Sequence, residues 1–137
     1  MIAIIDYGMG NLHSVAKAFE KAGAETAIVT QAAELREAGA IVLPGVGAFG
    51  RGMTNLQARG FVSAIQDAVA AGIPLIGICL GLQLLFAESE EMGEHQGLGL
   101  FPGRVRRLPR PLRVPHVGWN SLTRRKGRLF ENLAGEA

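Results

Sequence analysis

The sequence feature that most constrains the fold is the only cysteine, Cys79, which lies between two apolar stretches of different periodicity. Residues 73–78 form a short apolar run entered through a proline, as in a buried strand, and residues 80–87 have the spacing of an amphipathic helix. Gly77 and Gly81 flank the cysteine, so no Cβ atoms crowd a sharp turn from strand to helix. The pattern predicts a nucleophile elbow, like G-x-S-x-G with sulfur in place of oxygen.

A lone cysteine in an apolar run is more often a small buried hydrophobe than a nucleophile. For Cys79, its position in a turn between two glycines favours the interpretation as a nucleophile over that as a buried apolar residue. A position at a helix N-terminus also favours thiolate, because unpaired N–H groups and the helix dipole stabilise negative charge. Cys79 is therefore the candidate catalytic residue.

The composition predicts one α/β domain over residues 1–137, with 48% hydrophobic residues and 19 glycines. A single cysteine excludes an internal disulfide and is typical of a reducing compartment. The first residues carry no basic stretch of a signal peptide, and no apolar run approaches the roughly 18 residues of a membrane helix. We therefore expect a cytoplasmic protein without a membrane partner.

The charges are distributed unevenly along the chain. Residues 1–103 carry five Lys or Arg against ten Asp or Glu, whereas residues 104–137 carry nine against two. A basic segment of this kind can bind nucleic acid, face an acidic partner or form a solvated surface. Since Trp119 and Phe130 are the only aromatic residues of this basic segment, we expect no nucleic-acid partner.

Short apolar runs alternate with amphipathic stretches over the first eighty residues. Asn11 has the features of a helix N-cap, and Gly23 and Gly72 stand where helices are expected to end. Strands are expected at 2–5, 26–29, 40–43 and 73–78, and helices at 12–22, 31–38, 61–69 and 80–87.

Strands joined through helices imply parallel pairing by right-handed crossovers. The predicted fold class is α/β, with a doubly wound, flavodoxin-like, mostly parallel sheet and helices on both faces. Gly- and Pro-punctuated pieces at 98–108 and 112–122 predict antiparallel strands or hairpins as an extension on one edge. Ligands bind at the carboxyl ends of the strands in such sheets, where the glycine loops 7–10, 44–50 and 77–81 are expected to meet.

The loop Gly45–Gly50 matches G-x-G-x-x-G, but its surroundings do not fit a dinucleotide site. That site needs an acidic residue about 20 residues later at a strand end, and Asp67 lies in a helical pattern. The earlier glycine turn has His13 where a third glycine would stand, and the sequence has no P-loop motif. We expect no cofactor and no metal. The loop Pro44-Gly45-Val46-Gly47 is instead a candidate for an oxyanion hole made of backbone N–H groups, with a plain strand-ending turn as the alternative.

The stretch Gly77-Ile78-Cys79-Leu80-Gly81-Leu82-Gln83 resembles the nucleophile motif of the class-I, triad-type glutamine amidotransferases. Three further motifs narrow the resemblance to the glutaminase subunits that serve histidine biosynthesis. These motifs are Asp6–Asn11, Pro44–Phe49 and Pro115–Asn120. The resemblance runs from residue 1 to about residue 122, and the four motifs occur in order.

The resemblance implies that Cys79 attacks the side-chain amide of glutamine to give a thioester and ammonia, before water releases glutamate. It assigns the oxyanion hole to the backbone of Leu80 and of Gly45-Val46-Gly47, whose peptide would reorient. It assigns glutamine binding to Gly47 and Gln83. It also implies a (β/α)₈-barrel synthase (cyclase) partner that receives the ammonia. The positions that match the partner interface are Asn11, Trp119 and Asn120.

The family's catalytic His and Glu belong to a later H-x-E motif, which this sequence does not contain. Its histidines, His13, His95 and His116, match no catalytic position and none is assigned. Residues 1–137 are thus expected to form a single glutaminase domain that lacks its C-terminal part. The alternatives are a glutaminase for pyridoxal phosphate, purine or anthranilate synthesis, a non-catalytic binding or regulatory subunit of the same fold, and a cysteine-redox protein.

Overall fold

The computed structural model describes residues 1–109, 111, 113–121, 123, 126–127 and 130–131. The chain divides into two compact units, Met1–Arg107 and Leu108–Ala137. The helices and strands given below lie in the first unit. Within the described residues, no helix has both the length and the apolar character needed to cross a membrane.

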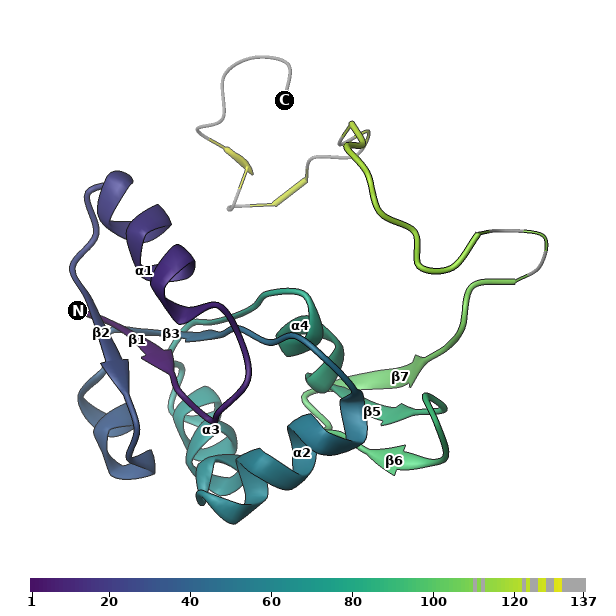
Figure 1. Cartoon of the computed structure of the whole chain (residues 1–137). Coiled ribbons are helices and arrows are strands. Elements are labelled where there is room, and N and C mark those ends of the chain that lie inside the picture. The colour runs from purple at the N-terminus through teal and green to yellow at the C-terminus, as the bar shows by residue number, and fades with distance from the viewer. Residues whose placement is uncertain (110, 112, 122, 124–125, 128–129, 132–137) are drawn as a thin grey trace. The chain divides into compact units, whose positions relative to one another are not determined.

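A four-stranded parallel sheet forms the centre of the first unit (Figure 1). Its strands are β1 (Ile2–Ile5), β2 (Thr26–Val29), β3 (Ala40–Leu43) and β4 (Leu75–Gly77). They lie in the order β2-β1-β3-β4, and Ile2 is in register with Thr26 and Ala40. This order and the parallel pairing confirm the predicted flavodoxin-like, doubly wound sheet.

The two faces of the sheet are covered by different helices (Figure 1). Ile4 and Val42 pack against Ala16 and Phe19 of α1 (Leu12–Lys21). Residues that alternate with them point to the opposite face and form the larger core. That core contains buried residues of η1 (Ala32–Glu37), α2 (Phe49–Ala58), α3 (Phe61–Ala70) and α4 (Leu80–Leu84).

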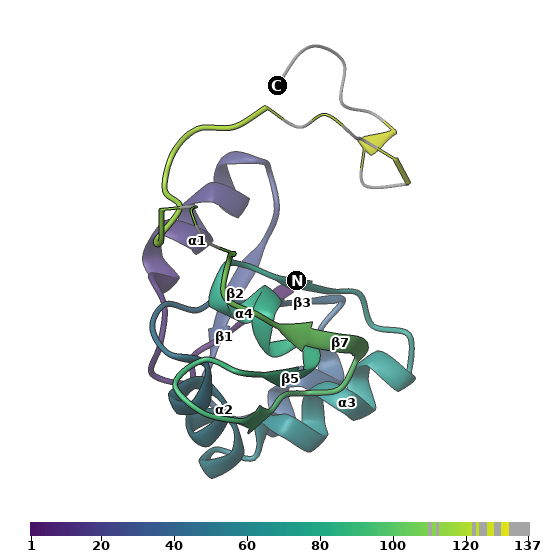
Figure 2. The same cartoon turned by 90° about the vertical axis from the view of Figure 1, so that its right-hand side faces the viewer.

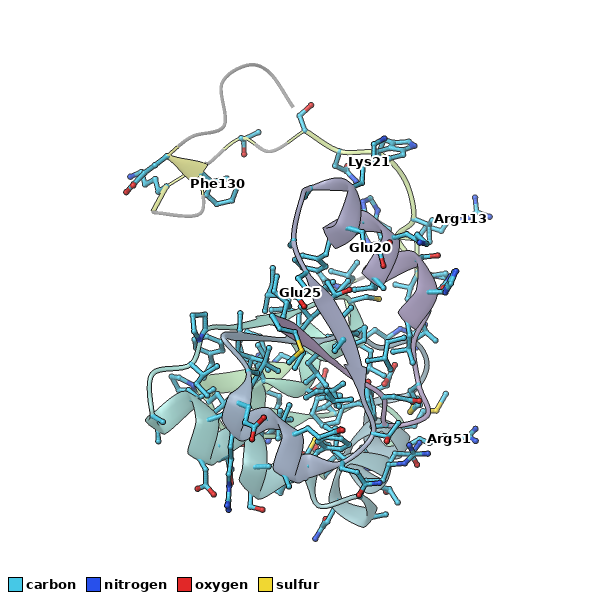
Figure 3. All side chains as sticks on the ribbon, turned by 90° about the vertical axis from the view of Figure 1, so that its left-hand side faces the viewer. Glu20, Lys21, Glu25, Arg51, Arg113 and Phe130 are labelled. Carbon is cyan, nitrogen blue, oxygen red and sulfur yellow. The ribbon has the colours of Figure 1, made fainter. Side chains whose placement is uncertain are left out.

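The first helix begins where the sequence predicts. The side-chain oxygen of Asn11 accepts a hydrogen bond of 3.2 Å from Ser14 N, which makes Asn11 the N-cap of α1. The helix gives way to a turn at Ala22 and at Gly23, whose φ is +83°. Figure 3 shows Glu20, Lys21 and Glu25 near this end of α1 and the start of β2.

Several expected boundaries are wrong. The strand expected at 73–78 is only Leu75–Gly77, and the helix expected at 31–38 is the 3₁₀ helix η1. The helix expected at 80–87 ends at Leu84. The carbonyls of Leu84 and Leu85 accept hydrogen bonds of 2.9 Å from Leu98 N and Leu100 N, so a later segment takes up the bonds that would continue the helix.

The helix α2 is not predicted by the sequence pattern at all. The loop expected at 44–50 ends at Ala48, because Phe49 already begins this helix. Gly50 and Gly52 fall in its first turns, and glycine lowers helix propensity by about 1 kcal/mol per residue. Tertiary packing of its buried residues therefore stabilises a helix that the local pattern does not favour.

A second, small sheet follows α4 (Figure 2). It consists of β5 (Phe86–Ser89), β6 (His95–Gln96) and β7 (Phe101–Val105), in the order β6-β5-β7. β5 pairs antiparallel with β6 and parallel with β7. The predicted edge extension is thus a separate sheet that begins at Phe86, before the expected segment 98–108. Of the second expected segment, 112–122, the described residues 113–121 contain no strand.

Candidate active site

Cys79 lies at the turn between β4 and α4, at the carboxyl end of the main sheet. Its φ of 55° and ψ of −116° are strained for a residue with a side chain, and its side chain is exposed. Ile78 N donates to the Leu43 carbonyl at 2.9 Å, and the Cys79 carbonyl accepts from Gln83 N at 3.3 Å. The predicted strand-to-helix elbow is therefore present, held by backbone bonds on both sides. Strain of this kind clusters at functional sites.

Two glycines make the elbow sterically possible. A Cβ at Gly77 would lie 2.6 Å from the backbone N of Leu82. A Cβ at Gly81 would overlap the carbonyl oxygen of Leu43 on the neighbouring strand. Both contacts are with backbone atoms, which cannot rotate away as a side chain can. The two glycines of the motif are thus required by the packing of α4 on the sheet.

The loop 44–47 lies directly beside the elbow. Pro44 and Gly45 are buried, whereas Val46 and Gly47 are exposed, and the φ of Gly47 is +103°. Leu80 N donates to the Gly45 carbonyl at 3.3 Å. In this arrangement the Leu80 N–H is engaged by the protein itself and does not face a substrate. Leu80 can act as an oxyanion donor only when the Gly45 carbonyl turns away.

Tyr7 fills the space on the inner side of Gly45. Its side chain is 0% exposed, and its hydroxyl has no hydrogen-bond partner among the described residues. A Cβ at Gly45 would overlap this hydroxyl. Burial and the nearby charge of Cys79 both raise the pKa of Tyr7, so the hydroxyl stays protonated. Sequence reasoning missed Tyr7, because an aromatic residue after a strand is the normal pattern of a core residue.

The segment around Tyr7 is held by α2 and by Arg59, the C-cap of that helix. Asn55 Nδ2 donates to the Tyr7 carbonyl at 3.1 Å, and Arg59 donates to the Asp6 carbonyl at 3.0 Å. The Asp6 carboxylate accepts from Gly8 N at 2.9 Å and lies 3.9 Å from the Arg59 guanidinium. The helix that the sequence analysis missed therefore positions the glycine turn after β1.

Glu91 fixes the other end of the loop. Ala48, the N-cap of α2, makes no side-chain cap bond, and the Glu91 carboxylate accepts from Phe49 N at 2.7 Å instead. His95 packs beside it, since a Cβ at Gly50 would lie 2.5 Å from the His95 ring. The start of α2 is thus anchored by Glu91, in the turn between β5 and β6, and packs against His95 of β6. No local pattern points to a contact 42 residues apart.

The remaining candidate residues lie in different parts of the chain. Gln83 is exposed on α4, one turn after Cys79. His13 is exposed on α1, and Asn11 caps that helix. In the part of the chain that the structure describes, no group of three or more His, Cys, Asp or Glu side chains could hold a metal ion.

Two predicted interface residues lie in the second unit, in the segment Pro115–Asn120. Trp119 is fully exposed, so none of the described residues of its own unit covers it. Asn120 Nδ2 donates to the Gly118 carbonyl at 3.3 Å and lies 3.5 Å from His116 Nε2. The polar contacts given for Asn120 are thus local, and the part of its unit that the structure describes places no core around Trp119.

Comparison with known proteins shows which family this chain resembles. The family model described as glutamine amidotransferase class-I matches residues 3–136. The subunit HisH of imidazole glycerol phosphate synthase from Moorella thermoacetica is 52% identical over 135 residues, which are 98% of this chain and 64% of the relative. The HisH subunit from Syntrophotalea carbinolica is 51% identical over 146 residues, covering 100% of this chain and 71% of the relative. The chain thus spans about two thirds of the length of these relatives.

The fold also matches a solved structure. The crystal structure of a glutamine amidotransferase superposes with a TM-score of 0.63 at 22% identity, over 73% of this chain and 53% of that chain. At this identity the likeness concerns the fold alone. It agrees with the parallel sheet and helices described above.

Proposed function

The chain belongs to the class-I glutamine amidotransferase family, and we propose that it acts as the glutaminase subunit of an imidazole glycerol phosphate synthase. The observation that carries this proposal is the strained backbone of Cys79, which presents an exposed thiol at a strand-to-helix elbow. Relatives of about 50% identity that carry the HisH name favour this function over glutaminases of pyridoxal phosphate, purine or anthranilate synthesis.

In the proposed reaction the sulfur of Cys79 bonds to the side-chain amide carbon of glutamine. The carbonyl π-bond opens to a tetrahedral oxyanion, and its collapse breaks the C–N bond. The thiol proton goes, through a general base, to the leaving nitrogen, which departs as ammonia. Water then attacks the thioester, releasing glutamate and restoring the thiol. The family's general base belongs to the H-x-E motif, which residues 1–137 do not contain. None of these residues is therefore assigned the role of general base.

The oxyanion requires backbone donors that the loop beside the elbow can supply. We assign one donor to Leu80 N–H and another to the Gly45-Val46-Gly47 backbone. Because Leu80 N–H is bound to the Gly45 carbonyl in this structure, the hole opens by rotation of that peptide. The exposed Val46 and the left-handed φ of Gly47 support this mobility. Gly47 and Gln83 are proposed to hold the glutamine.

The proposed partner is the (β/α)₈-barrel synthase (cyclase) subunit, which would receive the ammonia and form a cytoplasmic heterodimer with lyase activity. Trp119 supports the interface because a fully exposed tryptophan is typical of a residue that a partner covers. Asn120 is proposed to act beside it. Asn11 is proposed as a contact from the first unit, although its side chain already caps α1.

The test is glutamate production by the full-length protein in complex with a synthase subunit. We expect glutamine hydrolysis that a Cys79→Ala variant abolishes, and covalent labelling of Cys79 by a glutamine analogue that carries an electrophile. A complex that binds the synthase but neither hydrolyses glutamine nor labels Cys79 would support the alternative, a non-catalytic binding subunit of the same fold.

A further inference from the structure

The hydroxyl of Tyr7 is the buried polar atom that the described fold leaves without a hydrogen-bond partner. A buried hydroxyl without a partner is costly, and replacement by an apolar group of the same shape is often neutral or stabilising. A phenylalanine would fill the same volume after β1. The presence of the hydroxyl therefore calls for a bond that forms in another state of the site.

The neighbours of this hydroxyl identify the bond. Gly45 lies so close that a Cβ there would overlap the Tyr7 oxygen. The carbonyl of the same Gly45 is held by Leu80 N–H at 3.3 Å, near the long end of the hydrogen-bond range. Gly45 is buried, so a carbonyl that turned from Leu80 toward the Tyr7 side would need a new donor there.

We propose that Tyr7 is a positioning residue whose hydroxyl donates to the Gly45 carbonyl when that carbonyl leaves Leu80 N–H. The exchange conserves hydrogen bonds. In the structure described above, Leu80 N–H is bound and the Tyr7 hydroxyl is unpaired. In the second arrangement the Tyr7 hydroxyl is bound, and Leu80 N–H is released toward the position where Cys79 would form an oxyanion. This inference rests on the proposed glutaminase function.

The electrostatics suit this donor role. Burial raises the pKa of Tyr7, and the charge of Cys79 raises that pKa further. The phenol therefore keeps its proton at neutral and moderately alkaline pH and remains a hydrogen-bond donor there. Asn55 and Arg59 donate to the carbonyls of Tyr7 and Asp6, and these bonds hold the backbone of the Tyr7 segment during the exchange.

The test is Tyr7→Phe in the full-length protein bound to its synthase subunit. We expect kcat for glutamine hydrolysis to fall about tenfold or more, because an oxyanion donor is lost from the competent state. KM should change by less than about twofold, because glutamine binding is untouched. Phe61→Leu is the matched control, since Phe61 is a fully buried aromatic of α3. An unchanged kcat in Tyr7→Phe, or an equal fall in Phe61→Leu, would overturn the proposal.

Two further measurements separate this role from others. Alkylation of Cys79 by iodoacetamide should keep its pH profile in Tyr7→Phe, and a shifted profile would mean that the hydroxyl acts on the thiolate instead. Amide hydrogen exchange of Leu80 should slow in Tyr7→Phe, because the Gly45 carbonyl loses its second donor and stays on Leu80 N–H. Unchanged exchange would overturn the proposal whether or not the protein hydrolyses glutamine, whereas absent hydrolysis in the unmodified complex would overturn only the proposed function.

Discussion

The elbow around Cys79 and the segment Pro115–Asn120 both carry motifs of the family, but the fold uses their residues differently. At the elbow, Gly77 and Gly81 are required by backbone atoms a few ångströms away. In the segment, Gly118 has open space around the position of a Cβ, and Trp119 is fully exposed. The chain's own packing explains the first motif and leaves the second unexplained.

This difference separates two reasons for a residue to be present. Where a carbonyl occupies the space that a Cβ atom would need, only glycine fits. Such a glycine is required for folding, whatever reaction the protein catalyses. An exposed tryptophan contributes nothing to its own unit's core and costs solubility. The elbow glycines should therefore respond to substitution through stability, Cys79 through activity, and the segment through binding alone. Each prediction below tests one side of that division.

The largest effect is expected at the one elbow residue whose side chain is free of packing. Cys79→Ala removes the exposed nucleophile and should lower kcat for glutamine hydrolysis by at least about 10⁴-fold. Stability should not fall, since alanine tolerates the strained φ no worse than cysteine. Glutamate release and urea unfolding measure the two quantities. Supplying ammonia directly to the synthase should restore product, and failure to do so would mean that the variant damages the complex itself.

The second prediction compares one glycine from each region. Gly81→Ala places a Cβ on the Leu43 carbonyl oxygen and should destabilise the fold by about 3 kcal/mol or more. The Cβ of Gly118→Ala meets no atom of the described residues within 4 Å, and this variant should change stability by less than about 0.5 kcal/mol. Urea unfolding of both variants measures the free energies. Equal losses of unfolding free energy at the two glycines would show that the fold does not distinguish the elbow from the segment Pro115–Asn120.

Much of the fold follows from the sequence because its signals are local. The apolar runs 2–5, 26–29 and 40–43 are strands with the predicted bounds, since each is short and ends at a turn residue or a change in polarity. Asn11 caps α1 as expected, because a cap depends on residues within one turn. The doubly wound order follows from the alternation of strands and helices.

What the sequence could not show depends on contacts between distant residues. The helix α2 contains two early glycines and is stabilised by packing, so its own pattern is weak. Glu91 reaches Phe49 N, and Asn55 reaches the Tyr7 carbonyl, across more than 40 residues. The elbow at Cys79 was predictable from its glycines. The engaged Leu80 N–H and the unpaired Tyr7 hydroxyl were not, because both depend on where the fold places Gly45.

The third prediction concerns the exposed segment. Trp119→Ala should weaken binding to the synthase subunit by about 2 kcal/mol, or roughly 30-fold in Kd, as for an aromatic interface anchor. The free energy of unfolding should change by less than about 0.5 kcal/mol, because the side chain is exposed. Val117→Ala is the matched control, being a smaller side chain that is 87% exposed in the same segment. Loss of stability without loss of binding would make Trp119 a folding residue.

The smallest effect is expected at Asn11, which is both a residue that the fold uses and a proposed contact with the partner. Its side chain caps α1 through Ser14 N, and the resemblance also places it at the partner interface. Asn11→Ala should cost about 1 kcal/mol of stability by removing the cap, whereas Asn11→Ser keeps a capping oxygen and should cost less than about 0.5 kcal/mol. Urea unfolding measures the cap, and titration with the synthase subunit measures the contact. If Asn11 touches the partner, both variants weaken binding although only the alanine variant loses stability. If the serine variant binds as tightly as the unmodified protein, the fold alone explains Asn11, and the docking face loses its contact from the first unit.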